Sequence, residues 1–261
     1  MSSATTQFWF DGPLAFFTFN RPEALNAMTW EMYEALADAC ERVDRDADVR
    51  VFILRGAGGD AFVAGTDIRQ FASFRSGDDG VAYERRIDAV VDRLERVVVP
   101  TIAQVEGVAA GGGCVIALAC DLRVCTPKAR FGVPIARTLG NCLSAANYAR
   151  FIDLIGPART KDLLFTGRFV DVAEAQQIGL VTRLASPDVI DDVTRELASD
   201  IALNAPLTIK VSNEAIRRIS VRRRLEALET EDLIARCYGS DDFREGVTSF
   251  LEKRRPRFSG R

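Results

Sequence analysis

The feature that most constrains this chain is a run of three glycines, Gly111, Gly112 and Gly113, between an apolar strand and an apolar helix. Glycine has no Cβ, so a ligand or a second backbone segment can approach the main chain closely here. The first N–H groups of a helix have no intrahelical partner and lie at the positive end of the helix dipole. The pattern predicts either a site for an anion or oxyanion, or a close contact between helix and sheet.

Length and composition narrow the class of protein. A chain of 261 residues with 48% hydrophobic content can bury one large core, or one core and a small appended lobe. A net charge of −3 argues against nucleic acid or an anionic membrane as the main partner. Residues 1–10 lack the basic and apolar regions of a signal peptide, and no apolar run approaches the roughly 20 residues that span a bilayer. We therefore expect a soluble, cytoplasmic protein.

Two residue types limit the chemistry. The chain has no histidine, which excludes a Ser-His-Asp or Cys-His nucleophile, a histidine base and a zinc site with histidine ligands. Its six cysteines are scattered and form no CxxC pair, so we expect reduced, mostly buried side chains rather than a disulfide framework. Acid–base chemistry must then use Asp, Glu, Tyr, Cys, Lys or bound water.

Strand and helix signals alternate along the first two thirds of the chain. Residues 8–10 and 14–19 flank a turn signal and predict a hairpin, and apolar residues after Thr29 have helical spacing. Further strands are predicted at 51–54, 61–65, 101–105 and 121–125, and helices at 83–98 and 115–119. The rhythm indicates repeated ββα units in an α/β fold, and from about Pro187 onward the pattern is helical. We divide the chain into a core, residues 1–200, and a helical lobe, residues 201–261.

Several motifs occur together in an order that is specific for one family. The motifs are residues 20–27 (NRPEALNA), 62–68 (FVAGTDI), 100–107 (PTIAQVEG) with the following glycines, 120–123 (CDLR), 129–134 (ARFGVP), 173–181 (AEAQQIGLV) and 245–254 (EGVTSFLEKR). With these motifs the chain resembles the crotonase, or enoyl-CoA hydratase/isomerase, superfamily from end to end.

This resemblance implies a spiral of ββα repeats and a C-terminal all-helical lobe that assembles the chain into a homotrimer or a dimer of trimers. It implies an acyl-CoA substrate, with coenzyme A as part of that substrate and no permanently bound cofactor or metal. The thioester oxygen would accept hydrogen bonds from the backbone N–H groups of Thr66 and Gly112. Removing one such preorganised donor from an enzyme costs about 3 to 4 kcal/mol of transition-state stabilisation.

The resemblance also implies residues that contact the substrate. Phe250 and Lys253 of a neighbouring subunit would close the coenzyme A path, although an exposed charge is the default interpretation of Lys253, which lies in the run Lys253-Arg254-Arg255. Ala24 and Ala27 are open to a second interpretation as loop packing. The residues expected along the path and around the acyl group are Ala24, Ala27, Ala64, Asp67, Ile68, Gly111, Pro134, Ile135, Arg137, Asn141, Phe250 and Lys253.

The chain departs from the family pattern at the acid–base residues. Hydratases of this family carry one glutamate directly after the Gly-Gly-Gly-Cys segment and a second one twenty positions later. These positions hold Val115 and Ile135, and neither side chain can transfer a proton. A positioned acid or base contributes typically about 10² to 10⁴-fold to a rate, so we expect ordinary enoyl-CoA hydration to be crippled.

No carboxylate that could replace the two missing glutamates follows Pro134 closely, because residues 135–144 contain neither Asp nor Glu. Arg137 could hold a carboxylate of the acyl group. Asn141, Cys142 and Ser144 could bind water or a substrate polar group, or could simply form a polar helix N-terminus. Other candidates for acid–base work are Asp67, Glu84 and Glu106, the last with a structural role as its safer interpretation.

Three hypotheses follow. The first is an enzyme of the lyase or isomerase class in acyl-CoA (fatty acid) metabolism that stabilises a thioester enolate, for decarboxylation or isomerisation. The second is an acyl-CoA-binding protein with little or no turnover. The third, a dinucleotide-binding domain, is disfavoured because Gly107, Gly111, Gly112 and Gly113 do not form GxGxxG and no phosphate-binding loop is present.

Overall fold

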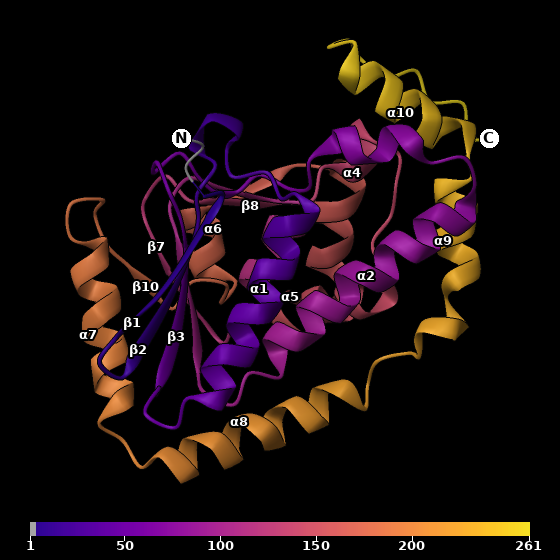
Figure 1. The fold of residues 1–261 in the computed structure, drawn as a ribbon. Helices are drawn as coiled ribbons and strands as arrows, with labels where there is room; N and C mark the ends of the chain where they lie inside the picture. Colours follow the sequence, from indigo (N-terminus) through magenta and orange to yellow (C-terminus); the bar gives the residue numbers. More distant parts are fainter. Residues whose placement is uncertain (1–3) are drawn as a thin grey trace.

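The computed structural model describes residues 4–261, and its strands form two sheets (Figure 1). Residues 1–3, part of the segment considered for a targeting signal, lie outside the described residues. The six-stranded sheet has the order β1(Thr6–Asp11), β2(Leu14–Phe19), β3(Val51–Gly56), β5(Thr101–Val105), β7(Leu122–Cys125), β10(Arg183–Leu184). The four-stranded sheet has the order β4(Ala61–Val63), β6(Val108–Ala110), β8(Arg130–Gly132), β9(Phe169–Asp171).

The two sheets arise from a repeated strand–strand–helix unit. The predicted hairpin is present, since β1 and β2 pair antiparallel with Asp11 opposite Leu14. In each later repeat the first strand (β3, β5, β7) joins the large sheet and the second (β4, β6, β8) joins the small one, and these strands pair parallel with one another within each sheet. At the edge of the small sheet, β9 pairs antiparallel with β8. The α/β class and the ββα repeats are therefore confirmed.

Helices cover both faces of the large sheet (Figure 1). The larger apolar core lies between the two sheets and the helices α1, α2, α3 and α5, whereas α7 covers a smaller cluster on the opposite face that includes Leu14, Phe16 and Ile53. The helices are α1(Trp30–Arg45), α2(Gly77–Glu95), α3(Gly112–Ala119), α4(Ile135–Thr138), α5(Ala145–Thr166), α6(Val172–Gln177), α7(Ile190–Ala202), α8(Pro206–Val221), α9(Glu231–Tyr238) and α10(Asp241–Leu251), with 3-10 turns at Pro22–Ala24 (η1), Ile68–Ser73 (η2) and Ala227–Glu229 (η3).

Several predicted boundaries differ from the structure, and two of these differences have a clear physical cause. The helix predicted at 83–98 begins at Gly77, because Asp79 in its first turn accepts hydrogen bonds from the N–H groups of Arg75 and Ser76, at 2.7 and 2.9 Å, and so fixes the entry of the chain into α2. The strand predicted at 61–65 ends at Val63, and Gly65 follows with a φ of +104° that ends the extended conformation.

Glycines attach the end of the helical lobe to the core. A Cβ on Gly77 would lie 2.1 Å from the carbonyl oxygen of Ala235, and a Cβ on Gly246 would lie 2.1 Å from that of Leu139. Helices α9 and α10 therefore pack at backbone distance against α2 and the end of α4. By contrast, α8 has no buried residue and runs across the bottom of the molecule (Figure 1).

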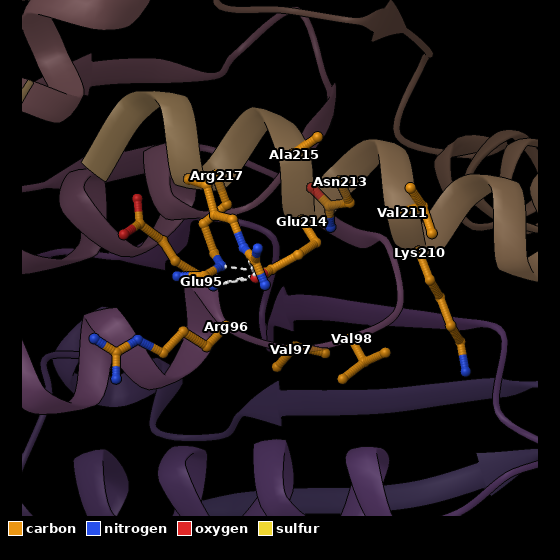
Figure 2. Close-up of a pocket in the computed structure, with 11 residues that line it drawn as sticks. Glu95, Arg96, Val97, Val98, Lys210, Val211, Asn213, Glu214, Ala215 and Arg217 are labelled. Carbon is orange, nitrogen blue, oxygen red and sulfur yellow. Dashed lines mark hydrogen bonds and ion pairs between the residues drawn. The ribbon is translucent and has the colours of Figure 1, made fainter. Parts of the chain in front are cut away.

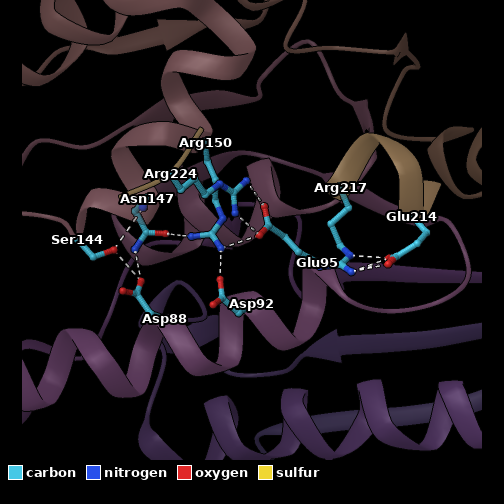
Figure 3. A network of polar contacts seen from close by, with 9 residues as sticks. All are labelled: Asp88, Asp92, Glu95, Ser144, Asn147, Arg150, Glu214, Arg217 and Arg224. Atoms are coloured by element: carbon cyan, nitrogen blue, oxygen red, sulfur yellow. Dashed lines mark hydrogen bonds and ion pairs between the residues drawn. The ribbon is translucent and has the colours of Figure 1, made fainter. Parts of the chain in front are cut away.

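A buried ion network also joins the lobe to the core (Figure 3). Glu95 of α2 accepts hydrogen bonds from Arg150 of α5 at 2.7 Å and from Arg224, which follows α8, at 2.6 Å. Arg150 also contacts Asp92 at 2.5 Å. These two arginines hold the pKa of Glu95 below its usual value although burial acts in the opposite direction.

Within residues 4–261, no helix is both long and apolar enough to cross a bilayer. All six cysteines are unbridged in the described part of the chain, four of them buried and two, Cys142 and Cys237, partly exposed.

We predict that Gly113→Ala destabilises the fold more than Gly112→Ala. A Cβ on Gly113 would lie 2.1 Å from the backbone oxygen of Val63, which cannot move without breaking the strand, whereas a Cβ on Gly112 would meet only side-chain hydroxyls. Overpacking costs about 1 to 3 kcal/mol. Urea unfolding of both variants measures the difference, and equal midpoints would contradict this assignment.

Candidate functional site

One cavity of about 660 Å³ collects most of the residues expected from the sequence. It lies between the turn after β4, the start of α3, one side of α2, and α4 and α10. The expected residues that line it are Ala24, Ala27, Ala64, Thr66, Asp67, Ile68, Gly111, Gly112, Val115, Pro134, Ile135, Asn141, Phe250 and Lys253.

Two glycine-containing turns meet at the floor of this cavity. Gly65 and Gly111 have φ values of +104° and +50°, which favour glycine. A Cβ on Gly111 would lie 3.8 Å from the Cα of Gly65, and one on Gly112 would lie 3.4 Å from Thr66 Oγ1. The turn after β4 and the start of α3 are therefore adjacent, as an oxyanion site built from both would require.

In the described part of the chain, the N–H groups of Thr66 and Gly112 donate no hydrogen bond to the backbone, whereas the N–H groups of their neighbours do. Gly111 N–H donates to the carbonyl of Gly132 at 2.9 Å, and Asp67 N–H donates to that of Met28 at 2.9 Å. Within residues 4–261, Thr66 N–H and Gly112 N–H have no backbone acceptor. Two free donors on adjacent turns can bind one oxygen atom of a ligand.

The side chain of Thr66 is fixed by two tyrosines that sequence reasoning missed. Thr66 Oγ1 lies 2.8 Å from the hydroxyl of Tyr33 on α1 and 2.8 Å from the hydroxyl of Tyr83 on α2. Both tyrosines are buried, and desolvation raises the pKa of each hydroxyl. The three hydroxyls orient the Thr66 backbone without adding charge. No motif in the sequence signals this contact.

The two positions without glutamate line the cavity with apolar surface. Val115 is 1% exposed and Ile135 is 8% exposed. Leu139, Leu143 and Ile87 line the same cavity. This part of the cavity therefore has a low dielectric and offers no proton donor of its own.

Asp67 is an ion-paired carboxylate. Its oxygens lie 3.0 Å from Arg21 and 2.5 Å from Arg69, and Asp67 also caps the 3-10 turn η2. The hydrogen bonds from Arg69, supported by Arg21, lower its pKa to about 2. A group that stays ionised at neutral pH is a poor proton donor, so Asp67 is unsuited to acid–base work.

Glu84 of α2 has the opposite environment. It is 3% exposed, lines the cavity and has no cationic partner among residues 4–261. Its Oε1 accepts a hydrogen bond from the hydroxyl of Tyr238 at 2.5 Å, and that hydroxyl accepts one from Asn141 Nδ2 at 3.1 Å. Desolvation raises the pKa of Glu84 to about 8. Its carboxyl is therefore largely protonated at neutral pH.

Four other candidates, Arg137, Glu106, Ser144 and Cys142, lie outside the lining of this cavity. Arg137 lines a neighbouring cavity with Arg254 and Phe258. Glu106 contacts Gln104, at 3.4 Å, beside the large sheet. The hydroxyl of Ser144 donates to Asp88 at 2.7 Å and caps α5.

Phe250 and Lys253 line the cavity of their own chain. The reason is the close packing of α10: a Cβ on Gly140 would lie 3.0 Å from the carbonyl oxygen of Asp242. The helix therefore folds back over its own core. That the same residues of a neighbouring subunit close the coenzyme A path stays a prediction.

Comparison with known proteins identifies the family. The model of the enoyl-CoA hydratase/isomerase family matches residues 10–261. The chain belongs to the enoyl-CoA hydratase/isomerase family. It is 35% identical over 246 residues to the short-chain-enoyl-CoA hydratase of Clostridium acetobutylicum, with 94% of each chain covered. It is 32% identical over 248 residues to the crotonyl-CoA hydratase of Syntrophomonas wolfei, again with 94% of each covered.

Solved structures of this enoyl-CoA hydratase/isomerase family share the fold. A methylmalonyl-CoA decarboxylase in complex with 2-nitronate-propionyl-CoA has a TM-score of 0.90 at 25% identity, with all of both chains covered. An enoyl-CoA hydratase/carnithine racemase from Magnetospirillum magneticum has a TM-score of 0.80 at 32% identity, with 100% of this chain and 97% of that chain covered. The crotonase fold is confirmed, and membership is compatible with more than one reaction.

We predict that Glu84→Gln changes how stability depends on pH. The unfolded-state pKa of Glu84 is near 4.5 and the folded-state value is about 8. Between these values the unfolded chain loses the proton first, so the wild-type free energy of unfolding falls with rising pH, by up to about 1.4 kcal/mol per unit. Glutamine does not titrate.

The measurement is urea unfolding of both proteins at intervals between about pH 5 and pH 8. The stability of Glu84→Gln relative to wild type should rise across this range. A constant difference between the two proteins would contradict the raised pKa.

Proposed function

We propose that this protein is an acyl-CoA enzyme that holds the thioester oxygen between the N–H groups of Thr66 and Gly112 and stabilises an enolate there. The observation that carries this proposal is the pair of backbone donors without acceptors on two adjacent turns. Two fixed amides in an apolar cavity stabilise developing negative charge without reorganisation. A thioester enolate supplies that charge.

The mouth of the cavity suits coenzyme A. Ala24, Ala27 and Ala64 leave room along one wall, and Arg69 and Lys253 add positive charge near them. Arg69 is largely exposed, at 70% of its side chain, so it can reach a phosphate while retaining its pair with Asp67. Small side chains and surface cations are what a long anionic carrier requires.

The reaction proposed is decarboxylation or isomerisation rather than ordinary hydration. Both pass through a thioester enolate as an intermediate, and neither needs the two glutamates that Val115 and Ile135 replace. The similarity to a methylmalonyl-CoA decarboxylase supports this direction. A second candidate function, acyl-CoA binding with little turnover, is favoured by the same two replacements.

The test is a panel of acyl-CoAs incubated with purified protein and analysed by mass spectrometry. Loss of carbon dioxide and addition of water give distinct product masses, and an isomerised double bond is resolved by chromatography. We predict that hydration of crotonyl-CoA is at least about 100-fold slower than in a relative that carries both glutamates. Comparable turnover would contradict the interpretation of Val115 and Ile135.

We further predict that Gly112→Pro lowers turnover of any accepted thioester by at least about 10² to 10³-fold, because proline has no N–H to donate. Gly112→Ala, which keeps the donor, is the matched control for crowding at this position. Turnover is measured beside thermal unfolding of each variant. Full activity of Gly112→Pro would overturn the proposed pair of donors.

We propose a homotrimer or a dimer of trimers, assembled through α8. Leu207, Val211 and Ile216 on this helix are 73%, 59% and 64% exposed, which is typical of an interface and not of a free surface. Between α8 and the end of α2 lies a groove of about 500 Å³, in which Glu214 pairs with Arg217 (Figure 2). Sedimentation of the purified protein measures the assembly.

A further inference from the structure

The cavity holds a second constellation, apart from the two backbone donors. Glu84 on α2, Tyr238 on α9 and Asn141 in the segment before α5 form a hydrogen-bonded chain, and both Glu84 and Asn141 line the cavity. The three come from segments far apart in the sequence. No sequence motif connects them.

A purely structural role does not account for this chain of side chains. A buried carboxyl without a cation costs stability, and an apolar pair would join α2 to α9 without that cost. Asn141 Oδ1 is also buried without a partner in the described part of the chain. Unfavourable polar groups of this kind concentrate at functional sites.

Glu84 lies where it could supply the proton-transferring group that the cavity lacks at Val115 and Ile135. The cavity wall formed by Val115 and Ile135 has no titratable group, and Asp67 is held ionised by its two arginines. Glu84 is the carboxyl of this cavity that lies in an apolar, cation-free environment. A carboxyl in such surroundings is the arrangement by which enzymes obtain a proton donor near neutral pH.

We propose that Glu84 transfers the proton to and from the α-carbon of the acyl group, with Tyr238 and Asn141 as positioning residues. The inference rests on the proposed function. In the forward direction the Glu84 carboxylate takes the α-proton: the C–H bond breaks, its electron pair forms the C=C bond of the enolate, and the carbonyl pair moves to the thioester oxygen. In reverse, Glu84 returns the proton to carbon.

The same assignment serves decarboxylation. There the bond from the α-carbon to its carboxylate breaks, carbon dioxide leaves, and the electron pair forms the enolate. The neutral Glu84 then protonates the α-carbon and regains its proton from water. The substrate class is an acyl-CoA with a hydrogen or a carboxylate on the α-carbon and an otherwise apolar chain.

The test is exchange of the α-hydrogens of butyryl-CoA in heavy water, followed by mass spectrometry. Wild-type protein should introduce deuterium, and Glu84→Gln should exchange at least about 100-fold more slowly while still binding butyryl-CoA. Glu106→Gln is the matched control, because that carboxyl also has a raised pKa but lies outside the cavity lining. Its exchange should equal that of the wild type.

The pH profile gives a readout that does not depend on the variant folding. Exchange by the wild type should rise with an apparent pKa near 8, the value of Glu84. Tyr238→Phe removes the hydrogen bond that lowers this pKa, so its profile should shift to higher pH. Other titratable groups surround Glu84 and come from each element packed against it. They are Tyr33 on α1, Tyr83 and Asp88 on α2, Cys142 before α5, Tyr148 on α5, and Cys237 and Tyr238 on α9.

The outcomes separate the two proposals. If the wild type and Glu84→Gln exchange the α-hydrogens equally fast, the proposal that Glu84 transfers the proton is overturned, whereas the proposed enolate site at Thr66 and Gly112 is not. If the wild type exchanges but the pH profile of its exchange rate has no inflection between about pH 6 and pH 9, the proton-transfer role of Glu84 is also overturned. If the wild type binds butyryl-CoA without exchange, Glu84 has no proton-transfer role; if it does not bind, the proposed function fails as well.

Discussion

The site depends on the close approach of two backbone segments that carry no side chains between them. Gly65 and Gly111 take backbone conformations that favour glycine, and Gly112 lies so near Thr66 and Tyr33 that a Cβ would contact both hydroxyls. This approach leaves two N–H groups without acceptors in the described chain. Thr66 and Gly112 are both partly exposed, so these N–H groups remain open to a ligand.

The glycines in this region have two separate purposes. Gly107 and Gly113 serve packing, since a Cβ on either would lie 1.9 to 2.1 Å from a carbonyl oxygen of the neighbouring strand segment. Gly111 and Gly112 face the cavity. The two readings of the glycine cluster, a ligand site and a close helix–sheet contact, therefore apply to different members of the same run, which sequence alone could not divide.

The fold and the cavity lining could be predicted because they depend on local patterns and on ordered motifs. Alternating strand and helix signals gave the ββα repeats, and the motif around Thr66 gave the turn after β4. The Glu84–Tyr238 contact could not be predicted in this way, because it joins residues 154 positions apart. The path of α10 over its own chain depends on Gly140 and Gly246, whose role appears only when the helices are packed.

The helical lobe contributes side chains to the cavity. Tyr238 of α9 bonds Glu84, and Phe250 and Lys253 close the cavity from the end of α10. Tyr238 packs over Gly80, where a Cβ would lie 2.2 Å from its ring, so the position of α9 sets the geometry of the carboxyl. If α8 lies in an interface between subunits, assembly fixes the segment that leads to α9. The acid–base environment of the cavity and the oligomeric state of the protein are then physically linked.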